Sequence, residues 1–143
     1  MEHEVQNLFE RYARFFGQSL AGEMDMDEAA ALYASDFIAA SPAGVTSGKN
    51  DHRFRQAMEQ GYAHYRAIGT KEMRIRHVRL SPIDDCHCVA HVAWTAIYAR
   101  KDQDAARIDF DVHYLVQVLD GEAKVFGWVS GDEQALLKQH GIG

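Results

Sequence analysis

Hydrophobic residues along the chain change their spacing once, from a helical period to an alternating one. Over residues 5–20, apolar and aromatic side chains recur every third or fourth position, which predicts a long amphipathic helix. The same spacing over residues 54–68 predicts a second long helix, which Gly69 would end. From residue 72 to residue 131, apolar side chains recur at every second position instead, which predicts strands.

A short segment between the two long helices has its own start and turn signals. Asp25, followed three residues later by Glu28, predicts the capped start of a short helix. Residues 37–40 fit a short strand, and Pro42 with Gly44 marks the turn after it. Asn50 or Asp51 is expected to cap the next helix.

Four strands are predicted in the second half of the chain. They cover residues 72–80, 86–98, 107–119 and 124–130. Asp120 and Gly121 predict a tight hairpin turn between the last two strands. In the last strand, Phe126, Trp128 and Ser130 alternate and are expected to share one face. Asp132 predicts the cap of a final short helix that ends at residue 141.

Helices first and an antiparallel meander afterwards are typical of the α+β class. One face of each long strand is almost wholly apolar and must be covered, and the two long helices have matching apolar faces. The pattern therefore predicts a curved antiparallel sheet wrapped around N-terminal helices, with a helix-lined apolar pocket. A chain of 143 residues fits one domain, residues 1–143.

The composition narrows the possible partners. The formal net charge of -6 argues against binding to nucleic acid or to anionic membranes, which require basic patches. The start of the chain lacks the basic and apolar segments of a signal peptide, and no apolar run is long enough for a membrane helix, so a cytoplasmic location is expected. No phosphate-binding loop or dinucleotide fingerprint is present, and no cofactor is expected.

Cys86, His87, Cys88 and His91 are residue types that bind metals. On a strand, the two cysteines point to one face and the two histidines to the other, so four ligands cannot converge. We expect no metal site here. The cysteines are expected to be free, buried thiols.

Large aromatic side chains dominate the predicted inner surface. Aromatic side chains at regular spacing usually form a packed core. However, this many rings rarely pack together without voids, and buried tyrosine hydroxyls need hydrogen-bond partners. A pocket and a packed core fit equally well around Ser41, and a packed core fits better elsewhere. The predicted ligand-binding residues are Tyr12, Phe16, Tyr33, Phe37, Ser41, Phe54, Met58, Trp94, Tyr98, Tyr114 and Trp128.

Asp109, Asp111 and His113 alternate along one strand, and His91 belongs to the strand before it. The alternation puts these side chains opposite the apolar face, where paired polar residues at a dimer surface are the expected arrangement. A register shift of one residue would exchange the two faces. His113 would then face the pocket and become a catalytic candidate.

Several short motifs, in order, carry a resemblance to a known family. They are Ala-Leu-Tyr-Ala-Ser-Asp at 31–36, Ser-Pro-Ala-Gly at 41–44, Ser-Gly-Lys at 47–49 and His-Tyr-Leu at 113–115. These motifs, together with the predicted order of helices and strands, make the chain resemble the nuclear transport factor 2-like superfamily. The resemblance is to its SnoaL-like and ketosteroid-isomerase-like branch. The resemblance implies a cone with a deep pocket between the concave sheet face and the helices, and dimers formed through the convex face.

The catalytic groups of ketosteroid isomerases are mostly absent. By resemblance, the general-base Asp before the Pro-x-Gly turn corresponds to Ser41, whose hydroxyl needs a base to move a proton near neutral pH. The oxyanion-stabilising Asp corresponds to Val112. The oxyanion Tyr corresponds to Tyr12, or to Phe15 in an alternative alignment. Isomerase activity is therefore not inferred.

The sequence thus predicts a homodimeric SnoaL-like protein that binds a small apolar molecule, with Ser41 on the pocket wall as a hydrogen-bonding group. The alternative is an enzyme that moves a proton on a small hydrophobic substrate, as an isomerase, hydratase or cyclase. Its candidate catalytic residues are Tyr12, Asp36 and His113. A third possibility is a cone that serves only for dimerisation.

Overall fold

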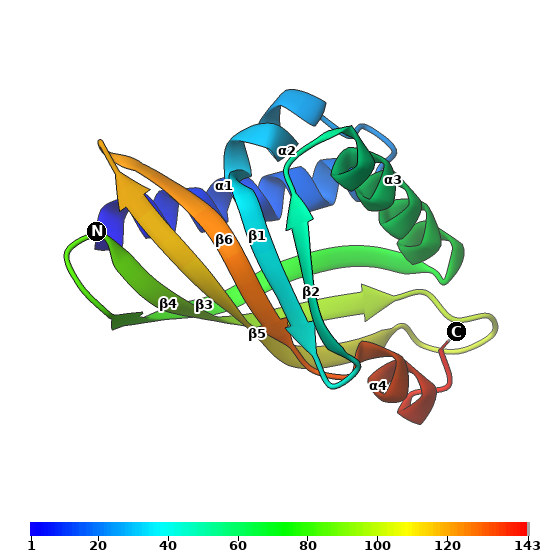
Figure 1. The fold of residues 1–143 in the computed structure, drawn as a ribbon. Helices are drawn as coiled ribbons and strands as arrows, with labels where there is room; N and C mark the ends of the chain where they lie inside the picture. Colours follow the sequence, from blue (N-terminus) through cyan, green and yellow to red (C-terminus); the bar gives the residue numbers. More distant parts are fainter. Residues whose placement is uncertain (143) are drawn as a thin grey trace.

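One strongly curved sheet wrapped around a long helix organises residues 1–142, the part of the chain that this computed structural model describes (Figure 1). The helices are α1 (Glu2–Leu20), α2 (Met26–Leu32), α3 (His52–Ala67) and α4 (Glu133–Gln139). The strands are β1 (Tyr33–Ser41), β2 (Gly44–Lys49), β3 (Thr70–Pro82), β4 (His87–Tyr98), β5 (Ala106–Leu119) and β6 (Glu122–Ser130). The predicted α+β class and curved sheet are confirmed.

Aspartates begin three of the helices, as the sequence predicts. The Asp25 carboxylate accepts hydrogen bonds from the backbone N–H groups of Asp27 and Glu28 at the start of α2. Asp51 caps α3 by accepting from the Phe54 N–H, and Asp132 caps α4 in the same way. These carboxylates satisfy N–H groups that have no partner within the helix.

The sheet has the strand order β2-β1-β6-β5-β4-β3. From β3 to β6 each strand pairs with the next one in antiparallel fashion, as the alternation predicts. The strands before α3 differ from expectation. β1 is longer than the predicted strand, β2 forms an antiparallel hairpin with it, and β1 pairs with β6 in parallel.

α1 lies along the concave side of the sheet, with α2 and α3 on the same side (Figure 1). Val5, Leu8 and Phe9 of α1 are almost completely buried, as are Val92 and Val116 on the concave faces of β4 and β5. These side chains belong to one continuous hydrophobic cluster. Burial of the apolar face of α1 therefore fixes the helix inside the cone.

A β-bulge in β6 corrects one prediction about side-chain direction. Leu115 pairs with Gly127 and Val116 with Val125, which leaves Phe126 as an extra, unpaired residue. The Phe126 ring lies 6.1 Å from the ring of His87, away from the concave face, whereas Trp128 points to the concave face. The extra residue shifts the alternation by one position, so Phe126 and Trp128 do not share a face.

No helix in residues 1–142 is both long enough and apolar enough to cross a membrane.

Truncating a leucine between α1 and the sheet should destabilise the protein strongly. Leu8 is 1% exposed, and Leu8→Ala removes buried methyl groups and leaves a cavity, so we expect a loss of about 2–5 kcal/mol in the free energy of unfolding. Urea denaturation measures this loss. Leu119→Ala is the matched control, because Leu119 is 50% exposed at the β5–β6 hairpin and should change the same quantity by only about 0.5 kcal/mol. Equal losses in the two variants would contradict the packing described here.

Candidate functional site

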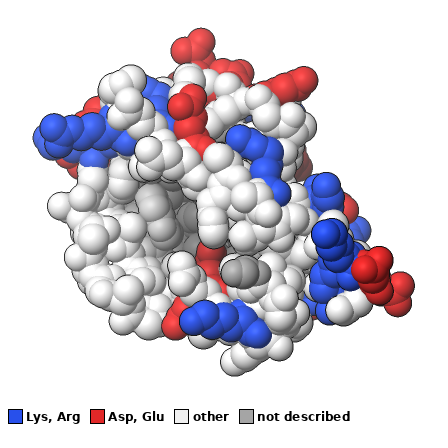
Figure 2. All heavy atoms as spheres, turned by 90° about the vertical axis from the view of Figure 1, so that its right-hand side faces the viewer, with Lys and Arg blue, Asp and Glu red and all other residues white. Residues whose placement is uncertain are grey.

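A cavity of about 230 Å³ lies between the concave face of the sheet and α1, α3 and α4. Its lining residues are Tyr12, Phe16, Tyr33, Phe54, Met58, Gly61, Tyr62, Tyr65, Met73, Trp94, Phe110, Val112, Tyr114, Trp128, Ser130 and Glu133. Figure 2, which looks at the end of the molecule where α3 and α4 lie, shows a hollow walled mostly by uncharged atoms. The helix-lined apolar cavity that the sequence predicts is present in the structure.

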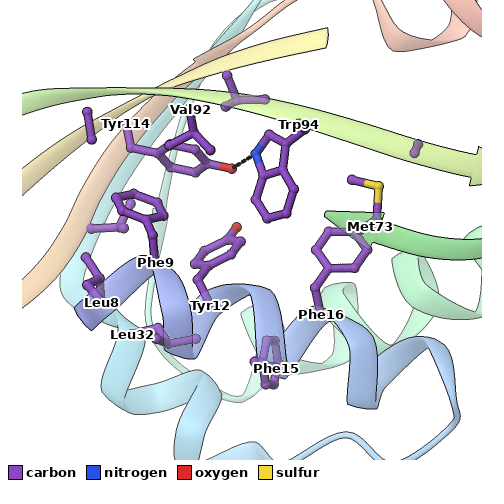
Figure 3. Packing of buried hydrophobic residues seen from close by; sticks show 14 of the residues in the cluster. Leu8, Phe9, Tyr12, Phe15, Phe16, Leu32, Met73, Val92, Trp94 and Tyr114 are labelled. Atoms are coloured by element: carbon purple, nitrogen blue, oxygen red, sulfur yellow. Dashed lines mark hydrogen bonds between the residues drawn. The ribbon is translucent and has the colours of Figure 1, made fainter. Parts of the chain in front are cut away.

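The helical period of α1 places two aromatic rings in this cavity. Tyr12 and Phe16 are one turn apart and lie on the same helix face. Both rings point from α1 toward Trp94 of β4 (Figure 3), with ring centres 6.0 Å and 5.8 Å from it. Phe15 packs on Tyr62 and is not part of the lining. Of the two residues that could match the oxyanion Tyr of the isomerases, Tyr12 is therefore the one in the cavity.

Two short hydrogen bonds join polar atoms in the cavity wall. The Tyr33 hydroxyl donates to the Tyr12 hydroxyl over 2.8 Å. The Trp94 indole N–H donates to the Tyr114 hydroxyl over 3.2 Å, as Figure 3 shows. Burial raises the pKa of Tyr12, and it raises the pKa values of Tyr33 and Tyr114 well above their ordinary value. These hydroxyls therefore stay protonated near neutral pH. They cannot take a proton from a ligand, and a hydroxyl among them whose proton is not already donated within the wall can donate one hydrogen bond to it.

Glu133 is the one acidic residue in the lining, and sequence reasoning missed it. It is the first residue of α4, and its Oε2 accepts a hydrogen bond of 3.1 Å from the Tyr65 hydroxyl of α3. Burial raises the pKa of the Glu133 carboxyl, and the bond from Tyr65 opposes that shift only in part. The Asp132 cap predicts α4 correctly, but sequence spacing does not reveal that the first residue of α4 meets Tyr65 of α3 in the cavity wall.

Eight of the eleven predicted ligand-binding residues line the cavity. The other three are Phe37, Ser41 and Tyr98. Phe37 packs behind the wall, with its ring centre 4.5 Å from that of Phe54 and 5.2 Å from that of Trp128. Tyr98 is buried in the hydrophobic cluster at the end of β4.

Ser41 lies apart from the cavity in which the sequence placed it. It ends β1, and its hydroxyl accepts a hydrogen bond of 3.2 Å from the Ala43 N–H in the turn to β2. Ser41 lines an adjoining surface depression with residues 130–134, and this depression shares Ser130 and Glu133 with the cavity wall. Because β1 runs through Ser41 before the chain turns, the hydroxyl stabilises the turn beyond the edge of the cavity.

Two of the three predicted catalytic candidates lie outside the cavity. The Asp36 carboxylate is exposed and lies 3.7 Å from the Lys49 ammonium. His113 pairs with His91 across β5 and β4 on the convex face, and their Nδ1 atoms are 2.7 Å apart. The predicted alternation therefore holds without a register shift. Of the three candidates, Tyr12 alone is part of the cavity.

Asp109 and Asp111 lie on the same convex face as His113. Asp109 accepts a hydrogen bond from Thr95, and both aspartates lie within 4 Å of the Arg76 guanidinium. They form a polar network on the outside of the sheet.

Both cysteines are free thiols. Cys88 is fully buried, and burial raises the pKa of its thiol, whereas Cys86 is half-buried. Within residues 1–142, no three His, Cys, Asp or Glu side chains lie close enough together to hold a metal ion.

A comparison with protein-family models identifies the family. The model described as "NTF2-like protein (DUF6841)" matches residues 2–133, and the chain belongs to this family. The predicted superfamily is thereby confirmed. No curated protein matches the chain in sequence.

Several solved structures share the fold of this chain. An NTF2-like protein of unknown function from Shewanella oneidensis has a TM-score of 0.66 at 12% identity, over 92% of this chain and 98% of that chain. An NTF2-like protein with a cystatin-like fold from Novosphingobium aromaticivorans has a TM-score of 0.67 at 10% identity, over 91% and 80%. A protein from the same species, provisionally assigned as a scytalone dehydratase, has a TM-score of 0.64 at 13% identity, over 90% and 80%. At such low sequence identities, the structural similarity to these proteins shows only that the fold is shared.

Removing the Glu133 carboxyl should change how stability depends on pH. The pKa of Glu133 is raised in the folded protein, so folding favours the neutral carboxyl over the carboxylate. The neutral carboxyl therefore contributes to the free energy of unfolding at low pH. This contribution is lost as the pH rises from 4.5, the ordinary pKa of a glutamate, through the pKa of Glu133 in the folded protein. Tyr65, the ionisable group in contact with Glu133, has a raised pKa and stays neutral over this range. The melting temperature of Glu133→Gln minus that of the unmodified protein should therefore be lowest near pH 4 and should increase toward pH 8.

Thermal melts at a series of pH values measure this difference. The matched control is Glu59→Gln, which removes an exposed carboxyl from α3 and should leave the pH profile of the melting temperature unchanged. A difference for Glu133→Gln that stays constant from pH 4 to pH 8 would show that its carboxyl is as well solvated as one in water.

Proposed function

We propose that this protein binds a small, mostly apolar molecule in the cavity, as a SnoaL-like binding protein. The observation that carries the proposal is the composition of the lining, in which ten of the sixteen residues are aromatic. An apolar cavity with a few converging polar groups is typical of small-molecule sites. The volume of about 230 Å³ is below that of common drug-sized pockets, so the ligand is small.

The polar groups of the lining would orient the ligand. The Tyr12 and Tyr114 hydroxyls each accept one hydrogen bond from the wall, from Tyr33 and Trp94 respectively. The shifts in the pKa values of Tyr12 and Tyr114 also include a hydrogen bond that Tyr114 donates to Tyr12, which leaves the Tyr12 hydroxyl with a proton to donate. A ligand with one acceptor oxygen or nitrogen would therefore be held by a hydrogen bond in addition to ring contacts.

A second candidate function is proton transfer on a small hydrophobic substrate. The observation that favours it is the Glu133 carboxyl, which lies in the cavity with a raised pKa, as general acids and bases in enzymes often do. Tyr12 would then stabilise developing charge on a substrate oxygen. Turnover that is lost in Glu133→Gln, while binding of the same compound persists, would favour this candidate over simple binding.

We also propose that the protein acts as a cytoplasmic homodimer whose convex faces meet. In the sheet, Ala40 of β1 pairs with Val45 of β2 on one side and with Val129 of β6 on the other. The Val129 side chain is 49% exposed. Ile38 of β1 is 48% exposed on the same face. An apolar patch of this kind, next to the paired histidines of β4 and β5, suits a contact with a second copy.

A charge in the middle of this patch should disrupt the dimer. Val129→Glu would put a carboxylate into the proposed contact, so we expect a monomer in sedimentation velocity where the unmodified protein is a dimer. Ile83→Glu changes an equally exposed aliphatic residue in the β3–β4 loop and should leave the dimer intact. A monomeric unmodified protein would overturn the dimer proposal without affecting the cavity.

Filling the cavity from α3 should abolish ligand binding without harming the fold. Gly61 lines the cavity, and a Cβ atom added there would meet no other atom within 4 Å. Gly61→Leu should therefore occupy part of the cavity. It should also stabilise the protein by up to about 1 kcal/mol, because glycine is a poor helix former.

Thermal-shift screening of small aromatic compounds tests both effects. A ligand at 100 times its dissociation constant stabilises the folded protein by about 2.7 kcal/mol, and this shift should vanish in Gly61→Leu. Gly17→Leu is the matched control, since it makes the same change on the exposed side of α1, also with open space around the new Cβ. Shifts of equal size in all three proteins would place the binding site outside the cavity.

A further inference from the structure

The Glu133 carboxylate lacks a cationic partner in the cavity. Its one side-chain hydrogen bond comes from the neutral Tyr65 hydroxyl, and it takes part in none of the ion pairs formed within residues 1–142. The lining described above contains no Lys, Arg or His. In Figure 2 the hollow has acidic atoms at one edge and no basic atoms inside it.

This arrangement leaves the half-buried Glu133 carboxylate without a charged partner. A carboxylate in apolar surroundings is costly unless an opposite charge or several hydrogen bonds compensate it. Tyr65 bonds only Oε2, and Oε1 accepts no hydrogen bond from a residue in the described part of the chain. A positive charge brought by a ligand would supply the missing partner.

The aromatic rings around Glu133 favour the same kind of ligand. The faces of Trp, Tyr and Phe rings attract cations, and cages of such rings are used to bind quaternary ammonium groups. Trp94 and Trp128, the residue type that attracts cations most strongly, both line the cavity, with eight Tyr and Phe residues. The ring faces and the carboxylate therefore both favour positive charge.

We propose that the cavity selects a small organic cation, an amine or quaternary ammonium compound with an apolar body, whose charged nitrogen lies beside Glu133 and the aromatic rings. This inference rests on the proposed function, because it names the class of molecule that the cavity binds. An anionic ligand would be repelled by the carboxylate. A neutral carbonyl compound could accept hydrogen bonds from a tyrosine hydroxyl or a protonated Glu133, but it would supply no positive charge to the ionised carboxylate.

Three probes of nearly the same size separate these classes. Phenethylammonium, phenethyl alcohol and phenylacetate share a phenyl ring on a short chain and differ chiefly in charge. Titration calorimetry at pH 7.5 should show that the unmodified protein binds phenethylammonium about tenfold or more tightly than phenethyl alcohol. Phenylacetate should bind more weakly than either.

Variants at Glu133 show whether the preference arises there. In Glu133→Gln the dissociation constants of the cation and the alcohol should come within a factor of about three, with the value for the alcohol almost unchanged. Glu133→Asp keeps the charge and should retain part of the preference. Glu59→Gln removes one exposed negative charge from α3 and should retain all of it, which excludes an effect of net charge.

The outcomes distinguish this inference from the proposed function. If the unmodified protein binds phenethyl alcohol or phenylacetate as tightly as phenethylammonium, the cation preference is wrong, while cavity binding that Gly61→Leu abolishes still stands. If Glu133→Gln keeps the preference, Glu133 is not its source and the inference fails. If no probe binds at millimolar concentration and no compound in the thermal-shift screen does, both the inference and the proposed function fail.

Discussion

The apolar concave face of the sheet has to be covered, and α1 is the element that covers it. Val5, Leu8 and Phe9 are buried in the hydrophobic cluster, and α1 packs on β3, β5 and β6. The contact is hydrophobic burial of two matching faces, which at about 25 cal/mol per Å² is the largest favourable contribution in a chain without disulfides. This contact sets the positions of α2 and α3, and therefore the position of the cavity.

The cavity follows from the kind of side chains used for this contact. At the wider end of the cone, α1 presents Tyr12 and Phe16 to Trp94 and Tyr114, with neighbouring ring centres 5–6 Å apart. Rigid planar rings pack edge to face and leave space that flexible aliphatic chains would fill. Buried hydroxyls are satisfied in pairs within the wall. The same rings thus serve as core on one side and as the lining of the cavity on the other.

Glu133 adds a charge to a site that is otherwise neutral. It reaches the cavity because β6 ends at Ser130 and the Asp132 cap begins α4 at once, and the Tyr65 side chain of α3 bonds its carboxyl across the cavity. By resemblance, the catalytic carboxylates of ketosteroid isomerases correspond to Ser41 and Val112 here, and the carboxyl in this cavity comes from a different element. The proposed ligand preference and the alternative of proton transfer both depend on this carboxyl.

The sequence by itself determined the features that depend on local periodicity: helix positions and caps, the antiparallel strands β3 to β6, and the faces of Trp94, Tyr114 and His113. It also predicted most of the aromatic lining, because rings on one face of a strand or helix must point the same way. The tertiary structure alone decided the parallel pairing of β1 with β6, the bulge at Phe126, the position of Ser41 outside the cavity and that of Glu133 inside it. Each of these depends on contacts between residues far apart in sequence, which no local pattern of spacing records.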